Sequence, residues 1–405
     1  MKILYLANLI PFPLDSGGKI CTYTTIKALS KCNDIDLLCF YEHEDIEKGK
    51  KELEKYCSSI DVLPIKVTTK ENMPLMVLKA AKGVFSNTPL GISKYIQPKM
   101  KAMIKKKMIS KKYDCVFFNI LAMFGYYDYI KDINPQIKTI LYEQNCEALI
   151  YRRLLKNTRS PLKKKFISTE TKKITRFETN AVRNSDKLIL LSKEDQFALG
   201  LDNKKCNIIP IGVLPPKRKK IYSDAKKDKI DLLFVGTMTW EPNNDGIIWF
   251  LQNVMPLCND EKRYELTIIG KNPSGTVTRL CKNFKNVNLL GYVKSLDEYY
   301  DKCDALIVPL FVGGGQRVKI IEAFGRGVAV ISTSVGAEGL RYIDGETIMI
   351  ADDAESFKLQ IDKCYSTEYL KKVGQSGRNI FDLEYSSEII EQKWNKALKR
   401  NEDDK

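Results

Sequence analysis

Residues 305–333 read ALIVPLFVGGGQRVKIIEAFGRGVAVIST. The opening ALIVPL is apolar throughout, as in a strand that is buried on both faces of a parallel sheet, and VAVIST at 328–333 has the same character. Between them, VKIIEAFGRG places apolar residues at helical spacing and closes on a glycine, which is typical of a helix end. The stretch therefore predicts a strand, a helix that ends at Gly327 and a second strand.

The loop FVGGGQR joins the first of these strands to the helix. Gly313, Gly314 and Gly315 allow a ligand to approach the main chain closely. Backbone N–H groups at a helix start bind phosphate oxygens, and the helix dipole favours the negative charge. Arg317 and Lys319 add positive charge at the same point. We therefore expect a phosphate-bearing ligand at this helix start.

Glu322 lies in the second turn of the same helix. Helical geometry puts it on the side of Val318 and Gly325, at the edge of the buried stripe. A buried carboxylate needs a partner, because an unpaired one is costly. The neighbouring hydroxyls of a sugar ring can supply it, which predicts a nucleotide with its diphosphate on the glycine loop and Arg317 and its ribose on Glu322. The alternative is an ordinary helix glutamate in a salt bridge.

Short apolar runs alternate with amphipathic stretches along most of the chain, a pattern typical of parallel sheets covered by helices on both faces. We predict two Rossmann-like domains, residues 1–212 and 231–380, joined by a linker at 213–230 that holds paired prolines. The ligand cleft is expected at the carboxyl ends of the strands. The predicted strands are 2–7, 34–41, 59–65, 115–119, 138–143, 187–192 and 207–212, then 231–236, 265–270, 286–293, 305–310, 328–333 and 347–351.

Each predicted domain opens with a strand, a glycine-bearing loop and a helix. Gly17 and Gly18 stand at the start of the first such helix, and Gly236 and Thr237 begin the loop TMTWEPNNDG after the second strand. Loops of this kind let backbone N–H groups face an anion. The alternative is that the glycines serve only the turn.

Positive charge is concentrated in the first half of the chain. Residues 1–210 hold 37 Lys+Arg against 22 Asp+Glu, a net of +15, whereas residues 211–405 hold 29 against 28, a net of +1. Within residues 151–187 there are 12 basic and 3 acidic side chains. Such a surface attracts nucleic acid, acidic lipid headgroups or a phosphorylated substrate. The alternative is a solvated, lysine-rich face.

Residues 94–112 mix lysines with isoleucines and methionines. This mixture suits a helix that lies on an anionic membrane with its apolar side down. Together with residues 151–187, it predicts that the first domain docks on the inner face of the cytoplasmic membrane. The alternative is that the apolar side chains face the domain core.

Several classes of protein are disfavoured by composition. The 11 cysteines are scattered without a C-x-x-C pair, which indicates reduced thiols rather than zinc sites or disulfides. The amino terminus lacks the features of a signal peptide. The longest apolar run, at 305–312, has eight residues where a spanning helix needs about 20. We therefore expect a cytoplasmic protein.

Four stretches resemble a family, the GT-B-fold glycosyltransferases of family 4, also called group 1. They are PFPLDSGG (11–18), YEQNCE (142–147), LLFVGTMTWEPNNDG (232–246) and VGGGQRVKIIEAFGRGVAVISTSVGAEGL (312–340). The resemblance implies transfer of a sugar from a nucleotide-diphosphate sugar to a glycan or lipid-linked glycan, with retention at the anomeric carbon and without a cofactor or metal. The only D-x-D, Asp34 and Asp36, starts a strand away from the expected cleft.

The resemblance also assigns roles to residues. Arg317 and Lys319 stabilise the leaving diphosphate, Glu322 binds the ribose, and the last helix, within 381–405, returns to the first domain and buries Ile389, Trp394 and Leu398. The remaining donor-site residues are Gly313, Gly314, Gly315, Gly236, Thr237, Tyr292 and Val293, and the acceptor or sugar side comprises Gly17, Gly18, Glu143, Gln144 and Asn145.

The chain departs from the family pattern at two positions. The usual E-x7-E has Gly314 in place of its first glutamate, and Gln144 stands where histidine is common. Backbone N–H groups and Arg317 are expected to replace the missing acid.

Two other functions compete with glycosyl transfer. A nucleotide-sugar epimerase of the same fold relies on a cleft histidine, but the sole histidine here is His43, in a charged loop. A nucleic-acid binder would interleave aromatic with basic residues, and residues 151–187 hold few aromatics.

Overall fold

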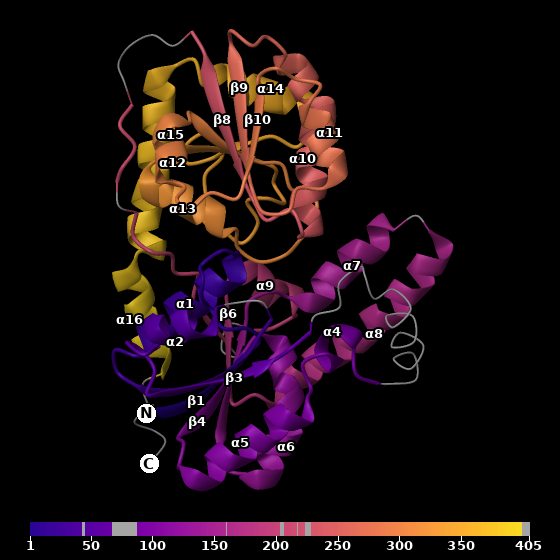
Figure 1. Ribbon diagram of the computed structural model, residues 1–405, viewed down its shortest axis with the longest axis vertical. Coiled ribbons are helices and arrows are strands. Elements are labelled where there is room, and N and C mark those ends of the chain that lie inside the picture. Colours follow the sequence, from indigo (N-terminus) through magenta and orange to yellow (C-terminus); the bar gives the residue numbers. More distant parts are fainter. Residues whose placement is uncertain are drawn as a thin grey trace. The chain divides into compact units, whose positions relative to one another are not determined.

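The computed structural model describes residues 1–42, 45–66, 87–158, 160–202, 206–216, 218–222 and 228–398. The chain divides into two compact units (Figure 1). The first unit comprises Met1–Pro210 and Glu391–Lys405, and the second comprises Ile211–Ile390. His43 lies outside the described residues.

A parallel sheet, seven-stranded in the described part, forms the centre of the first unit in the order β3-β2-β1-β4-β5-β6-β7. The order reverses between β1 and β4, so the loops that leave these two strands diverge at the carboxyl edge, where such folds bind ligands. The strands are β1 (Lys2–Ala7), β2 (Asp34–Tyr41), β3 (Ser59–Pro64), β4 (Cys115–Asn119), β5 (Lys138–Glu143), β6 (Lys187–Leu190) and β7 (Cys206–Ile208).

Helices cover this sheet. They are α1 (Gly17–Leu29), α2 (Ile46–Leu53), α4 (Leu90–Ser93), α5 (Pro98–Ser110), η2 (Leu121–Tyr126), α6 (Tyr127–Ile133), α7 (Glu147–Asn157), α8 (Pro161–Asn184) and α9 (Lys193–Ala198). Helices α7 and α8 pack on each other as a hairpin that projects beyond the sheet (Figure 1).

Helix α5 covers most of the lysine-rich segment 94–112, and its apolar side faces the core. Met100 and Ile104 are fully buried, and Ile96, Met103 and Met108 pack against the same core cluster. The expectation that this segment lies apolar side down on a membrane is therefore wrong, because the side chains that would enter the bilayer are used in packing.

The second unit repeats the architecture with a parallel sheet, six-stranded among the described residues, in the order β10-β9-β8-β11-β12-β13. The order reverses between β8 and β11. The strands are β8 (Ile230–Val235), β9 (Tyr264–Ile269), β10 (Val287–Gly291), β11 (Ala305–Val308), β12 (Ala329–Ser332) and β13 (Met349–Ile350). The helices are α10 (Glu241–Asn253), η3 (Met255–Cys258), α11 (Gly275–Cys281), α12 (Asp297–Lys302), α13 (Val318–Arg326), α14 (Ala354–Lys363), α15 (Thr367–Ile380) and η4 (Phe381–Tyr385).

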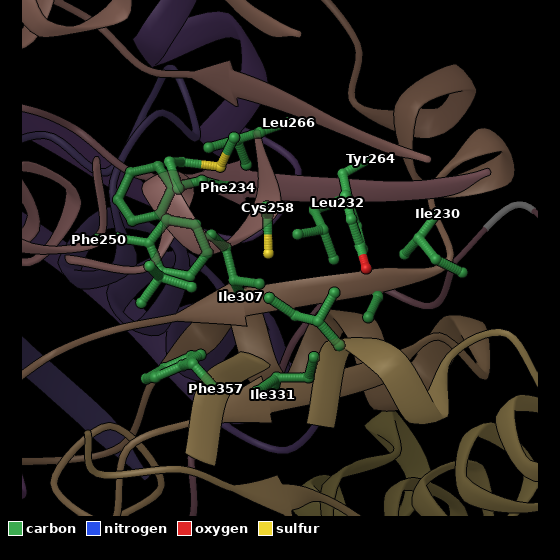
Figure 2. Close-up of a cluster of buried hydrophobic side chains, with 14 of the residues drawn as sticks. Ile230, Leu232, Phe234, Phe250, Cys258, Tyr264, Leu266, Ile307, Ile331 and Phe357 are labelled. Carbon is green, nitrogen blue, oxygen red and sulfur yellow. The ribbon is translucent and has the colours of Figure 1, made fainter. Parts of the chain in front are cut away.

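A hydrophobic cluster fixes the strands of the second unit. Figure 2 shows Leu232, Phe234 and Ile307 from β8 and β11 beside Phe250 and Phe357 from the covering helices. The rings of Phe250 and Phe357 meet edge to face, with their centroids 5.5 Å apart. Because the cluster anchors both central strands, the loops at their carboxyl ends start from a rigid base.

The last helix, α16 (Ser387–Leu398), divides between the units: its first four residues belong to the second unit and the remainder to the first. Trp394 is 1% exposed, and its ring lies 5.8 Å from that of Phe117 and 5.2 Å from that of Tyr142. Leu398 is buried as expected, but Ile390 is buried instead of Ile389, which is only partly covered.

The predicted linker, 213–230, attaches to the second unit in its described part. The hydroxyl of Tyr222 donates to the Gly327 carbonyl at 3.0 Å, and the N–H of Lys220 donates to the Arg326 carbonyl at 2.7 Å.

The predicted parallel sheets, one in each of two units, are confirmed. The helix of the opening stretch ends where expected, because Gly327 has a positive φ of 73°. No helix in the part of the chain that the structure describes is both long and apolar enough to cross a membrane.

Candidate active site

The loop before α13 approaches its own arginine closely. Arg317 is 6% exposed, and its Nη1 donates to the carbonyls of Gly314 and Gly315. A Cβ at Gly313 would lie 2.6 Å from Nη2 of Arg317, and the φ of Gly313 is 139°. The Arg317 guanidinium also lies 5.6 Å from the Trp240 ring centroid. The positive φ of Gly313 is a backbone conformation that favours glycine at this position.

Lys319 lies one residue inside the amino end of α13. Its Nζ donates to Oδ1 of Asn243 at 2.8 Å and lies 4.9 Å from the Phe234 ring centroid. Burial, and then the Arg317 guanidinium, lower the pKa of Lys319 to about 7, against an opposing effect of Glu322. Near neutral pH the amine is therefore poised between its neutral and charged forms.

Glu322 follows one turn later, partly covered, as helical periodicity predicted. Its pKa is raised to about 7, chiefly by burial; the charges of Arg326 and Lys319 oppose this shift, and that of Asp297 adds to it. Arg326 forms a 2.8 Å salt bridge with Asp297. Arg326 is thus already engaged by another carboxylate, and Glu322 retains the capacity to accept hydrogen bonds.

The loop after β8 lies beside this helix start. The Asn243 side chain, 5% exposed, donates from Nδ2 to the Thr237 carbonyl at 3.0 Å. A Cβ at Gly236 would lie 2.7 Å from Cγ of Asn243, so a side chain there would displace the Asn243 amide. The structure therefore brings Gly236, Thr237, Arg317 and Lys319 together at the point where the strand order reverses.

Tyr292 and Val293 follow β10, two strands away from β8. Tyr292 is 59% exposed, with Nζ of Lys271 4.6 Å from its ring centroid. These two residues lie at the carboxyl edge of the same sheet but are not among the contacts that hold Arg317 and Lys319.

In the first unit, Gly17 and Gly18 are the first residues of α1 and are exposed. The Gln144 side chain is 6% exposed, and its Nε2 donates to Oδ1 of Asn119 at 3.0 Å. Asn119 donates in turn to Oγ1 of Thr22 at 2.9 Å. Gln144 therefore ties the end of β5 to β4 and α1.

Glu143, at the end of β5, is 1% exposed. Burial first, and then the negative charge of Glu178, hold its pKa well above the usual range. Glu178 accepts the backbone N–H of Ala148 at 3.1 Å. Burial and the neighbouring Glu178 therefore favour the protonated form of Glu143, at the carboxyl edge of the sheet. Asn145, the next residue but one, is partly covered.

Asp36, from the D-x-D sequence, lies fully buried at the amino end of β2. Burial raises its pKa, but hydrogen bonds from Lys111, Ser59 and Tyr113 outweigh this effect and lower the pKa to about 2. Its role is to hold β2 to the neighbouring elements, at the edge of the sheet opposite to the carboxyl ends.

Two residues of these clusters, Asn243 and Asn119, were not singled out from the sequence. Asn243 lies within the quoted stretch 232–246, where asparagine before a helix is typical of a turn. Asn119 is the last residue of a predicted strand, and a polar residue at the carboxyl end of a strand is the sequence feature that could have indicated it.

Part of the chain matches the model of a known protein family. Residues 229–367 match the model of the family described as glycosyl transferases group 1. A Klebsiella pneumoniae protein described as an uncharacterized 44.6 kDa protein in the cps region is 26% identical over 375 residues, covering 89% of this chain and 90% of that protein.

Solved structures share the fold over almost the whole chain. Anabaena HepE, solved in complex with UDP-glucose, aligns with a TM-score of 0.66 at 15% identity, covering 98% of this chain and 99% of HepE. Sucrose-phosphate synthase from Thermosynechococcus elongatus aligns with a TM-score of 0.71 at 15% identity, covering 98% and 97%. The chain therefore shares its fold with these solved structures over nearly its whole length, and residues 229–367 match the glycosyl transferases of group 1.

Proposed function

We propose that the protein transfers a sugar from a nucleotide-diphosphate sugar to a glycan or lipid-linked glycan, in polysaccharide or glycoconjugate synthesis. The main support is that Arg317, Lys319 and Glu322 lie together in the first turns of α13, beside a glycine loop. Two cations and a helix start suit a diphosphate, and the carboxylate one turn later suits the ribose.

The chemistry requires the diphosphate to depart from the anomeric carbon with its negative charge stabilised. Arg317 and Lys319 supply that charge stabilisation, because hydrogen bonds within the protein already hold both side chains at the start of α13 before the reaction. In the proposed mechanism the acceptor attacks from the face that the diphosphate leaves, and the diphosphate takes the acceptor's proton. The configuration is then retained, and the protein itself needs no general base.

We propose that neither metal nor cofactor takes part. Arg317 and Lys319 bring two positive charges to the diphosphate position, a role that a divalent cation plays in other phosphate sites. The nucleotide-diphosphate sugar is then a substrate and not a cofactor, and its nucleoside diphosphate is the leaving group.

The comparisons support parts of this proposal. The complex of HepE with UDP-glucose supports a uridine-diphosphate sugar as donor, and the cps-region relative supports a polysaccharide as product.

The projecting α7–α8 hairpin supports docking on a membrane surface. Leu162 and Phe166, one helical turn apart at the start of α8, are 84% and 39% exposed. The three lysines between them, 163–165, are exposed as well. Two apolar side chains flanked by lysines fit an anionic bilayer, with the rings and alkyl groups in the interface and the ammonium groups at the headgroups. Such docking would bring the protein to a lipid-linked acceptor at the inner face of the cytoplasmic membrane.

Vesicle flotation tests the docking. The protein should float with phosphatidylglycerol vesicles and stay behind with phosphatidylcholine vesicles, and added salt should release it. Leu162→Glu combined with Phe166→Glu should abolish flotation, whereas Ile109→Glu, at a position on α5 that is 70% exposed, should not. Equal behaviour of the two variants would contradict docking through the hairpin.

A thermal-shift screen against nucleoside diphosphates and their sugars tests the donor site. A ligand at 100 times its dissociation constant stabilises a fold by about 2.7 kcal/mol, which is readily seen as a raised melting temperature. Product analysis then separates transfer to an acceptor from epimerisation of the sugar. A shift with nucleic acid but with none of the nucleotides would instead favour a binding protein.

A further inference from the structure

Asn243 connects the two segments that form the proposed donor site. Its Nδ2 donates to the Thr237 carbonyl at 3.0 Å, in the loop after β8, and its Oδ1 accepts from Nζ of Lys319 at 2.8 Å, in the first turn of α13. One amide therefore uses its two ends to link the two segments, and Asn243 and Lys319 are 76 residues apart in the chain.

The surroundings fix this amide in one orientation. Asn243 lies in the first turn of α10, is 5% exposed, and packs so closely on Gly236 that a Cβ there would lie 2.7 Å from its Cγ. Turning the amide over would bring its NH2 group against Lys319 and its oxygen against a carbonyl. Both contacts would be lost, and buried polar groups would be left unpaired.

Lys319 depends on this contact. The other groups that face it are the Phe234 ring from β8, the Arg317 guanidinium from the preceding loop and the Glu322 carboxyl from its own helix. The Arg317 charge repels the ammonium, and the ring gives no directional acceptor. Asn243 is thus the neutral acceptor that aims the flexible lysine side chain.

We propose that Asn243 is a positioning residue for the transfer reaction, which holds the Lys319 amine where the departing diphosphate develops its charge. The inference rests on the proposed function. An asparagine suits this role because it accepts a hydrogen bond without neutralising the cation. The charge of Lys319 then remains available to the diphosphate, whereas a carboxylate in its place would form an ion pair with the lysine.

A double-mutant cycle tests whether Asn243 acts through Lys319. Asn243→Ala should lower kcat about tenfold, as expected when a hydrogen bond to a charged group is lost, with a smaller change in the donor KM. In a Lys319→Met background, Asn243→Ala should have little further effect on kcat. Equal losses in both backgrounds would overturn the inference.

Asn243→Asp provides a second test, because it preserves shape and volume. The new carboxylate should raise the pKa of Lys319 by about one unit or more. Donor binding weakens at high pH as Lys319 loses its proton, and this loss, the alkaline limb of the pH profile, should move to higher pH by the same amount. Asn253→Asp, at the exposed far end of α10, should leave that limb unchanged. An unmoved limb in Asn243→Asp would contradict the inference. Absence of donor binding in the wild-type protein would instead overturn the proposed function.

Discussion

Donor binding should be strongest near pH 7 and should weaken on both sides. Glu322 accepts hydrogen bonds from ribose hydroxyls only when it is ionised, and its pKa is raised to about 7. Lys319 attracts the diphosphate only when it is protonated, and its pKa is lowered to about 7. Falling pH therefore removes the first interaction, and rising pH removes the second.

The size of the effect follows from the two pKa values. With both at about 7, the fraction of protein with Glu322 ionised and Lys319 protonated is about one quarter at pH 7 and about one hundredth at pH 5 or pH 9. Because apparent affinity scales with the binding-competent fraction, the Kd should rise about 25-fold at either extreme. The diphosphate of a nucleotide sugar is a diester that stays ionised throughout, so its charge does not change between pH 5 and pH 9.

Isothermal titration calorimetry between pH 5 and pH 9 measures this dependence, with melting curves recorded at each pH to confirm that the protein is folded. Glu322→Gln should bind about ten- to hundredfold more weakly at pH 7 and lose the acid limb, since the amide does not titrate. Lys319→Arg should lose the alkaline limb, since the guanidinium stays charged. An affinity that is constant from pH 5 to pH 9, or limbs that persist in these variants, would refute the assignment of both residues.

Three further outcomes are expected. Arg317→Ala should slow turnover about ten- to hundredfold, because the charge beside the departing diphosphate is lost, and steady-state kinetics equal to wild type would contradict that role. Trp394→Ala should reduce the stability of the first unit by about 3 to 5 kcal/mol, because its ring fills a site against Phe117 and Tyr142; urea denaturation with an unchanged midpoint would contradict this. Transfer activity should survive dialysis against EDTA, and a loss that is restored by Mg²⁺ or Mn²⁺ would show that a metal is needed.

The parallel sheets could be predicted because buried strands are continuous apolar runs that helices separate. The runs extend further than the hydrogen-bonded strands, however. The apolar run at 207–212 continues past Ile208, the last residue of β7. The strand does not extend along the whole run, because Pro210 has no N–H to donate.

The position of α5 could not be predicted. A stripe of methionines and isoleucines beside lysines is the same pattern whether the stripe faces a membrane or a protein core. Only the tertiary contacts of Met100 and Ile104 decide between the two.

The charged residues at the glycine loop could be recognised locally, because they are adjacent in the chain. The contact between Asn243 and Lys319 could not, because it depends on the strand order that brings the carboxyl ends of β8 and β11 together. The burial that shifts the pKa values of Lys319 and Glu322 depends on the same packing.

The division of α16 has a consequence for synthesis on the ribosome. The first unit is complete only when residues after 390 have emerged, whereas the second unit is encoded without interruption between 211 and 390. Until then, the rings of Phe117 and Tyr142 lack their contact with Trp394. The second unit can therefore finish folding first, although its codons come later than most of those for the first. A chain that is cut short near its end would expose this apolar surface and become prone to aggregation.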